Sequence, residues 1–186
     1  MRRPAEIFEA LAETLDPVQV MQRFGLSREE LQELLRQAAS TWQAFEGDWL
    51  LYVDGASRGN PGPAGAGAVL YDPLGQVQKR GSRFLGRATN NVAEYQGLLL
   101  GLALAREKGA RRLQILADSE LMVHQLNGRY RVRNPGLLPL WQAATKALEE
   151  FDAWSISHVD RSLNAEADRL ASQAIDQARQ GSYNDT

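Results

Sequence analysis

The sequence predicts an α/β fold in which helices pack on a five-stranded mixed sheet, with a small helical segment ahead of the sheet. From Asp48 onward, short apolar runs alternate with Gly- and Pro-rich stretches, which is typical of strands and turns. Longer segments with helical periodicity stand between the later runs. Three strands in succession can form an antiparallel meander, whereas strands reached through a helix should lie parallel to their neighbours.

Residues 1–46 are expected to form three short helices. Asp16 is suited to cap the second helix, and Gly25 is suited to end it. Ser27 and Glu30 form a capping box at the start of the third. This spacing could pass for a helix-turn-helix, but five basic against eight acidic residues argue against phosphate binding. We therefore expect a packing or dimerisation appendage that is dispensable for chemistry.

The other elements follow in order along the chain. Strands are predicted at "WLLYVD", "GAVLY", "VQKRGSRFL", "RRLQILAD" and "AWSISHV". Helices are predicted at "NVAEYQGLLLGLALAREKG", "SELMVHQLNG", "NPGLLPLWQAATKALEEF" and "NAEADRLASQAIDQARQ". The first three strands come before any of these helices, and the last two strands each follow a helical stretch. We place the boundaries of the three parts of the chain at 1–46, 47–180 and 181–186, of which the last is a flexible tail.

Composition limits the classes of function. The 186 residues include no cysteine and two histidines, which excludes disulfides and thiolate metal sites and argues against a histidine-rich zinc site. Any catalytic metal ion should therefore be bound mainly by oxygen atoms. No apolar run approaches the ~20 residues of a membrane span, and the N-terminus has no signal-peptide pattern. We expect a cytoplasmic protein that does not enter a membrane.

The stretch "YVDGASRGNPGPAGAGAVLY" suggests a phosphate-binding loop, but its pattern argues against one. It lacks G-x-x-x-x-G-K-[ST], and no G-x-G-x-x-G leads from a strand into a helix. The glycines lead instead into a second strand. We expect Asp54 to end the first strand beside a flexible loop that lets the backbone of another molecule come close.

Three further acids occupy comparable places. Glu94 lies in the first turn of the long helix, Asp118 ends an apolar strand, and Asp168 lies in the first turn of the last helix. Strand ends and helix starts tend to gather at one edge of such a sheet. Clustered carboxylates repel one another and take up protons unless cations neutralise them. Oxygen ligands with this charge suit Mg²⁺ or Mn²⁺.

Each acid also has a local explanation. Asp54 could belong to a turn with the glycine that follows it, and Glu94 could complete a capping box with Asn91. Asp118 could cap the helix that follows, and Asp168 could complement a helix dipole. The metal-site hypothesis is favoured because it accounts for all four acids together.

Four blocks of this sequence resemble the four motif blocks of type 1 ribonuclease H, in the same order and at similar spacing. They are "DGASRGNPGPAGAGAVL", "TNNVAEYQGLLLGL", "ADSELMVHQLNG" and "HVDRSLNAEADRLA". The resemblance runs from about Asp48 to Gln177 and does not cover residues 1–46. It implies the ribonuclease H-like fold, a five-stranded mixed sheet flanked by helices.

The resemblance also implies a reaction. The four acids, Asp54, Glu94, Asp118 and Asp168, would be catalytic residues that bind two Mg²⁺ or Mn²⁺ ions. Water would attack a phosphodiester in the RNA strand of an RNA–DNA hybrid, leaving 3′-hydroxyl and 5′-phosphate ends. His158, ten residues before the last acid, matches a histidine that assists proton transfer or product release in this family. Arg161 is a rival for that role, whereas His124 is expected to be structural.

Substrate contacts are implied for polar residues near the metal ions. Residues that match positions at or beside substrate contacts are Ser57, Asn60, Asn90, Asn91 and Ser119. Thr89 matches a phosphate contact on the DNA strand. The alternative for these residues is ordinary turn chemistry.

The basic protrusion of many bacterial members is replaced here by the short stretch "NGRYRVRNPGLLPLW". Its Arg129, Arg131 and Arg133 would lie on one side of an extended segment and could grip the hybrid, with Asn134 near a phosphate. A solvated face is the alternative.

Two other functions stay open. A non-catalytic nucleic-acid-binding module with the same fold is one, although the presence of all four acids counts against it. A nuclease that also acts on double-stranded RNA is the other, because both duplexes present 2′-hydroxyl groups.

Overall fold

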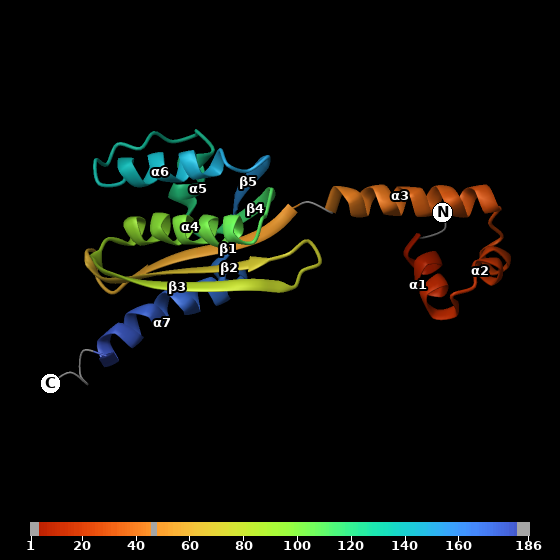
Figure 1. The fold of residues 1–186 in the computed structure, drawn as a ribbon, viewed down its shortest axis with the longest axis horizontal. Coiled ribbons are helices and arrows are strands. Elements are labelled where there is room, and N and C mark those ends of the chain that lie inside the picture. Colours follow the sequence, from red (N-terminus) through yellow and green to blue (C-terminus); the bar gives the residue numbers. More distant parts are fainter. Residues whose placement is uncertain (1–3, 46–47, 182–186) are drawn as a thin grey trace. The chain divides into compact units, whose positions relative to one another are not determined.

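The computed structural model describes residues 4–45 and 48–181, and Figure 1 shows its helices and strands. The chain divides into two compact units, Met1–Glu46 and Gly47–Thr186, which are described separately below. The tail predicted at 181–186 lies outside the described residues except for Gly181, which ends the last helix. Within the described ranges, no helix is both long enough and apolar enough to cross a bilayer.

The first unit is a three-helix unit, and its helix signals are confirmed. The helices are α1 (Pro4–Thr14), α2 (Pro17–Phe24) and α3 (Arg28–Phe45). The Asp16 side chain accepts bonds from two backbone N–H groups at the start of α2, and Gly25 ends this helix in the left-handed conformation. Ser27 and Glu30 form the reciprocal bonds of a capping box. The buried core of the unit consists of Ile7, Ala10, Val20 and Leu31.

The second unit contains the predicted five-stranded mixed sheet. Its strands are β1 (Asp48–Ser57), β2 (Gly62–Tyr71), β3 (Val77–Ala88), β4 (Arg112–Ala117) and β5 (Ala153–His158). They lie in the order β3-β2-β1-β4-β5. The first three strands pair antiparallel, whereas β4 pairs parallel with β1 and β5 pairs parallel with β4. The predicted meander and parallel extension are therefore confirmed.

Helices cover both faces of this sheet. One face carries α4 (Asn90–Glu107), with α5 (Glu120–Leu126) and α6 (Leu138–Leu148) on the same side (Figure 1). The 3₁₀ turn η1 (Arg161–Leu163) precedes α7 (Ala165–Gly181), which lies on the opposite face. The main core lies between the sheet and the first group of helices, where Leu51, Val53, Leu98 and Ile115 are fully buried.

The expectation of a flexible glycine-rich loop is wrong. β1 continues to Ser57 and β2 begins at Gly62, so the stretch forms a hairpin, and Asp54 lies inside β1 rather than at its end. The small residues let α7 lie against β2. A Cβ atom on Gly67 would lie 2.2 Å from the carbonyl oxygen of Ala167 in that helix. Gly65 and Gly67 of this stretch therefore serve helix packing inside the protein.

Candidate metal centre

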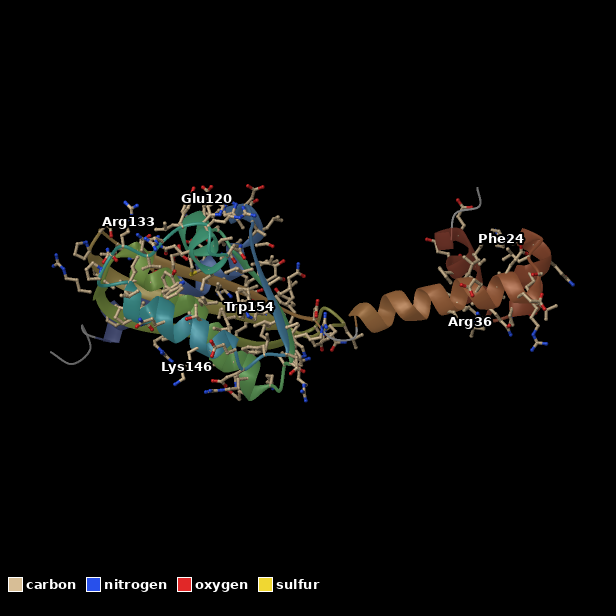
Figure 2. All side chains as sticks on the ribbon, turned by 90° about the horizontal axis from the view of Figure 1, so that it is seen from above. Phe24, Arg36, Glu120, Arg133, Lys146 and Trp154 are labelled. Atoms are coloured by element: carbon tan, nitrogen blue, oxygen red, sulfur yellow. The ribbon has the colours of Figure 1, made fainter. Side chains whose placement is uncertain are left out.

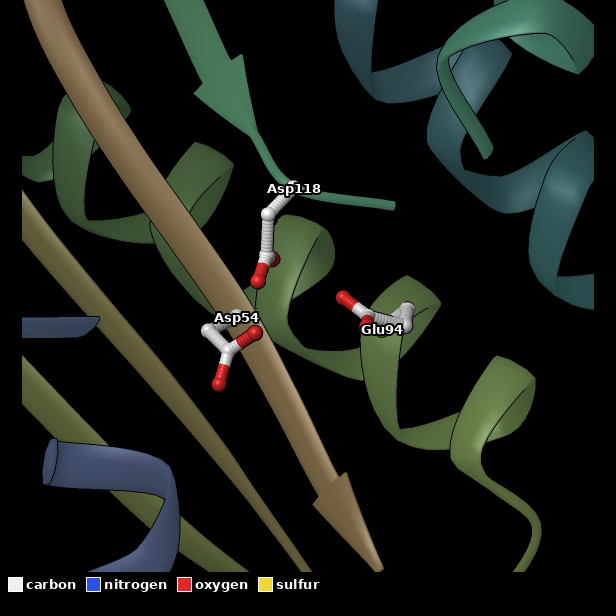
Figure 3. A group of neighbouring side chains, drawn as sticks. All are labelled: Asp54, Glu94 and Asp118. Atoms are coloured by element: carbon white, nitrogen blue, oxygen red, sulfur yellow. The ribbon is translucent and has the colours of Figure 1, made fainter. Parts of the chain in front are cut away.

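Three acids from distant parts of the sequence meet at one edge of the sheet. Asp54 of β1, Glu94 of α4 and Asp118 each offer a carboxylate oxygen within 4.8 Å of those of the other two. Figure 3 shows the three side chains pointing toward one another. Val53 and Ala117 form the last pair in the parallel register of β1 and β4. Since Asp54 and Asp118 each follow a member of that pair, the sheet itself brings these two acids side by side.

The position of Glu94 depends on close contact between α4 and β1. A Cβ atom on Gly55 would lie 2.1 Å from the backbone of Ala93 and Glu94. From the other side, a Cβ atom on Gly97 would lie 2.3 Å from the carbonyl oxygen of Asp54. The absence of a side chain at both glycines lets the two backbones touch. This contact places Glu94 over the strand that carries Asp54.

The start of α4 differs from the prediction. Thr89 is the N-cap residue and the first turn contains no acid, so Glu94 lies in the second turn and not in the first. The capping box suggested with Asn91 is therefore wrong, because Thr89 and not Asn91 is the N-cap residue. Asn90 instead donates its side-chain N–H to Oε1 of Glu94 at 3.3 Å. Asn90, one helical turn toward the N-terminus of α4, therefore helps to orient the carboxylate of Glu94.

Asp168, the fourth acid, is bound by an arginine. It lies in the first turn of α7, and its Oδ1 is 2.5 Å from Nη2 of Arg161. Arg161 also lines a cavity of about 420 Å³ together with the three clustered acids. The charge of Asp168 contributes to raising the pKa of Asp54. Asp168 thus acts electrostatically on the cluster while its own charge is paired.

The cluster holds more negative charge than its surroundings neutralise. Asp54 and Glu94 are 3% and 5% exposed. Burial, followed by the charge of Asp118, raises the pKa of Asp54 to about 8. Burial and the charges of Asp54 and Asp118 raise the pKa of Glu94 to about 9, and its Oε2 has no hydrogen-bond partner. A divalent cation bound by oxygen ligands would supply the missing positive charge, so these residues fit such an ion.

Two further local explanations, those for Asp54 and Asp118, are also wrong. Asp54 lies within a strand and not in a turn. The N-cap residue of α5 is Ser119 rather than Asp118, and Oδ1 of Asp118 accepts a hydrogen bond from Asn164 at 3.1 Å. Asp168 does lie where it could complement a helix dipole, in addition to its pairing with Arg161.

The structure separates the candidates for an assisting cation. His158 ends β5 and is exposed, and it is not among the residues that line the carboxylate cavity, whereas Arg161 is. His124 lies in α5 with Nε2 3.3 Å from Oε1 of Glu120 and with its ring 4.7 Å from that of Tyr130. These contacts fit the structural role expected for His124.

Several predicted substrate residues tie the β1–β2 turn to the start of α4. Ser57 donates its hydroxyl to the carbonyl oxygen of Ala88 at 2.8 Å and also to that of Gly59. The Asn60 side chain accepts a bond from the backbone N–H of Asn90 at 3.3 Å. Ser57 and Asn90 also line the carboxylate cavity. These residues therefore combine turn chemistry with a place beside the acids.

The remaining predicted substrate residues make local interactions or are simply exposed. Thr89 caps α4 through the backbone N–H of Val92. Ser119 is the N-cap residue of α5 but makes no capping bond with its side chain. Asn91 is exposed. Asn134 accepts a bond from the backbone N–H of Gly136 at 2.8 Å, which is a turn interaction outside the carboxylate cavity.

Asn164 is a residue at this site whose contacts the sequence did not predict. It is 1% exposed, and its amide reaches both β1 and Asp118. The sequence indicated only that it precedes the last helix. No spacing signal could have revealed contacts that span 111 and 46 residues of sequence.

Comparisons with known proteins agree on the second unit. A family model described as "Reverse transcriptase-like" matches residues 52–174. Ribonuclease HI of Halobacterium salinarum is 44% identical over 127 residues, which are 68% of this chain and 64% of that protein. The crystal structure of RNase H1 from this archaeon is similar at a TM-score of 0.69 and 43% identity, covering 70% of this chain and 99% of that chain.

Two further proteins are similar over the same region. "Bifunctional protein Rv2228c" of Mycobacterium tuberculosis is 44% identical over 137 residues, which are 73% of this chain but only 38% of that protein. The crystal structure of LC11-RNase H1 in complex with an RNA/DNA hybrid is 36% identical, with a TM-score of 0.67, and covers 70% of this chain and 98% of that chain. The matched region thus spans 38% of the mycobacterial and 64% of the halobacterial relative.

We predict that Gly55→Ala disrupts the contact between α4 and β1. Because the added Cβ would lie 2.1 Å from the backbone of α4, the free energy of unfolding should fall by about 3 kcal/mol or more. Urea unfolding followed by circular dichroism measures this loss. Gly136→Ala is the control, since its Cβ would meet only a side-chain oxygen at 3.2 Å. A Gly55→Ala protein as stable as the control would contradict the close contact.

We predict that the metal-free protein loses stability as the pH rises. Asp54 and Glu94 have pKa values of about 8 and 9 in the folded state, against ordinary values of 3.8 and 4.5. Their contribution is therefore fully present below about pH 4 and is lost as the pH rises through about 8 to 9. With EDTA present, Asp54→Asn should lose less of its melting temperature than the wild type between pH 5 and 9.

The control for this experiment is Glu149→Gln, which changes an exposed acid at the end of α6. Its melting temperature should follow that of the wild type at every pH. Parallel curves for Asp54→Asn and the wild type would contradict the charge repulsion assigned to the cluster.

Proposed function

The chain belongs to the ribonuclease H family, and from this premise we propose that it is a metal-dependent endoribonuclease that hydrolyses the RNA strand of RNA–DNA hybrids. The observation that carries the proposal is the cluster of Asp54, Glu94 and Asp118, in which the pKa values of Asp54 and Glu94 are raised by burial and by the neighbouring acids. The hybrid as substrate is supported by the relative LC11-RNase H1, whose structure is a complex with an RNA/DNA hybrid.

The proposed cofactor is a pair of Mg²⁺ or Mn²⁺ ions held by Asp54, Glu94, Asp118 and Asp168. When bound, such ions supply an activated water and stabilise the charge that develops on the leaving 3′ oxygen. The products would then carry 5′-phosphate and 3′-hydroxyl ends. One oxygen of Asp168 is already paired with Arg161, so this acid is the more weakly available of the four.

The chain's own residues would orient the scissile phosphate. Arg161 places a guanidinium at the cavity that the acids line, where it could donate hydrogen bonds to a phosphate oxygen. Ser57 and Asn90 line the same cavity. Together with Asn60, Asn91 and Ser119, these residues are proposed to contact the RNA strand near its 2′-hydroxyl groups. Thr89 is proposed to contact a phosphate of the DNA strand, next to its role as a helix cap.

A basic loop could hold the duplex farther from the cluster. Arg129, Arg131 and Arg133 are all exposed, and Figure 2 shows Arg133 projecting away from the ribbon. Two of the three, Arg131 and Arg133, line a groove of about 530 Å³ beside α6 with the exposed ring of Tyr130. We propose that these cations contact phosphates through a sequence-independent interaction, with Asn134 beside them.

The alternative functions are less well supported. A non-catalytic binding module gives no reason for two buried acids with raised pKa values. Cleavage of double-stranded RNA as well as hybrids is compatible with the same cavity. We place the chemistry in residues 47–180, because the described part of residues 1–46 contributes no acid to the cluster.

The proposal predicts metal-dependent cleavage of a labelled RNA–DNA hybrid. Mg²⁺ or Mn²⁺ should support cleavage that leaves 5′-phosphate and 3′-hydroxyl ends. Asp118→Asn should lower the rate more than about 100-fold, since even partners that only orient a metal ligand cost 10–100-fold, while the protein still binds the hybrid.

Two outcomes would contradict the proposal, and a competition experiment tests the choice of substrate. If neither metal ion supports cleavage, the enzyme proposal fails. If cleavage is unchanged in Asp118→Asn, the activity belongs to a contaminating nuclease. Competition with unlabelled double-stranded RNA measures how far the enzyme prefers the hybrid.

We predict that Arg161 contributes more to turnover than His158. Arg161→Ala should lower kcat about 10- to 100-fold, because it removes hydrogen bonds to charged groups at the cavity. His158→Ala should change kcat less than about threefold. Arg106→Ala, which breaks an exposed pair with Glu150 on the helical face, controls for loss of a surface arginine. The reverse order of effects would return the assisting role to His158.

A further inference from the structure

We propose that Asn164 is a positioning residue that holds three of the four acids in one arrangement and thereby sets the affinity of the site for divalent cations. This inference rests on the proposed function. Asn164 itself lies between η1 and α7 and is almost completely buried. It is not among the residues that line the carboxylate cavity, so it acts through the acids.

The side chain of Asn164 spans the end of the β1–β4 ladder. Its Nδ2 donates one hydrogen bond to the carbonyl oxygen of Val53 at 2.9 Å and another to Oδ1 of Asp118 at 3.1 Å. Val53 directly precedes Asp54 and belongs to the last pair of this ladder. One amide group therefore links the strand that carries Asp54 to the carboxylate of Asp118.

The backbone of Asn164 extends the link to the last acid. Its carbonyl oxygen accepts a hydrogen bond from the backbone N–H of Asp168 at 3.1 Å, which begins the first turn of α7. A shift of Asn164 would therefore move Asp118, the end of β1 and the start of α7 relative to one another. Asn164 makes no hydrogen bond to the helix that carries Glu94, which is placed instead by the contact of α4 with β1.

The orientation of the Asn164 amide is fixed by its partners. A carbonyl oxygen and a carboxylate oxygen can only accept, so the NH₂ group must face them and the amide cannot be flipped. Its Oδ1 is left buried without a hydrogen-bond partner. An unpaired buried acceptor is unfavourable for stability. The arrangement is therefore better explained by the placement of Asp118 than by a gain in stability.

The hydrogen bond from Asn164 helps to fix the orientation of Asp118, which lies beside two other acids. Among the described residues, Asn164 is the side-chain N–H donor that holds Asp118. On the opposite side the carboxylate faces Asp54 and Glu94. Without the amide, Asp118 would be free to turn away from these charges. The site would then have to reorder this acid each time a cation binds, which weakens binding.

The test measures Mn²⁺ binding to the full chain by isothermal titration calorimetry, so it does not require activity. The variants are Asn164→Leu, which has a similar shape and no donor, and Asn164→Ala, which leaves room for water. Both should bind Mn²⁺ about 10-fold or more weakly than the wild type, as found for partners that orient metal ligands. Circular dichroism melting with EDTA checks that each variant is folded.

Asn127→Leu is the matched control. The Asn127 amide donates to the carbonyl oxygen of Ile156 in β5 at 3.2 Å and to no carboxylate. This variant should lose stability and keep the Mn²⁺ affinity of the wild type, which separates positioning from a purely structural role.

The outcomes distinguish this inference from the proposed function. If the wild type binds no Mn²⁺, the metal-dependent function itself fails. If the wild type binds and a folded Asn164 variant binds equally well, the function stands and the positioning role is overturned. If Asn164→Leu does not fold, the affinity of Asn164→Ala decides. An equal loss of affinity in Asn127→Leu would also overturn the inference.

Discussion

The direct contact between the backbones of β1 and α4 is the constraint on which the rest of the site depends. A sheet can place Asp54 and Asp118 side by side through its own register, but it cannot bring an acid from a covering helix to the same point. Helices normally stand off a sheet by the thickness of their side chains. Here Gly55 and Gly97 have no side chains between the two backbones, so α4 contacts β1 directly beside Asp54. Glu94 therefore reaches the cluster, although its helix packs on the face of the sheet.

This geometry concentrates charge that the protein alone does not neutralise. The raised pKa values of Asp54 and Glu94 mean that the metal-free site binds protons in place of a cation near neutral pH. Protons and divalent ions therefore compete for the same oxygens. The apolar core between the sheet and α4 offsets the unfavourable free energy of burying these acids together. The same acids that can bind a cation therefore lower the free energy of unfolding of the metal-free protein.

Much of the fold could be predicted because its signals are local. The caps at Asp16 and Ser27 and the order of strands and helices depend on residues close in sequence, and the structure confirms them. The role of the glycine-rich stretch could not be predicted, because Gly65 and Gly67 contact α7, a helix about 100 residues farther along the chain. The acids could be picked out by type and by family resemblance. The pairing of Asp168 with Arg161 and the amide of Asn164 could not, since both depend on how α7 enters the fold.

The ties between the β1–β2 turn and the start of α4 affect how this rim of the cavity would meet a nucleic acid. Ser57 and Asn60 bond to Ala88 and Asn90 across the two segments. These bonds hold the β1–β2 turn against the start of α4. An incoming strand meets polar groups that are already ordered, so little conformational entropy is lost when it docks. Recognition at this rim would therefore proceed by docking to a preformed surface, with little conformational change in the protein.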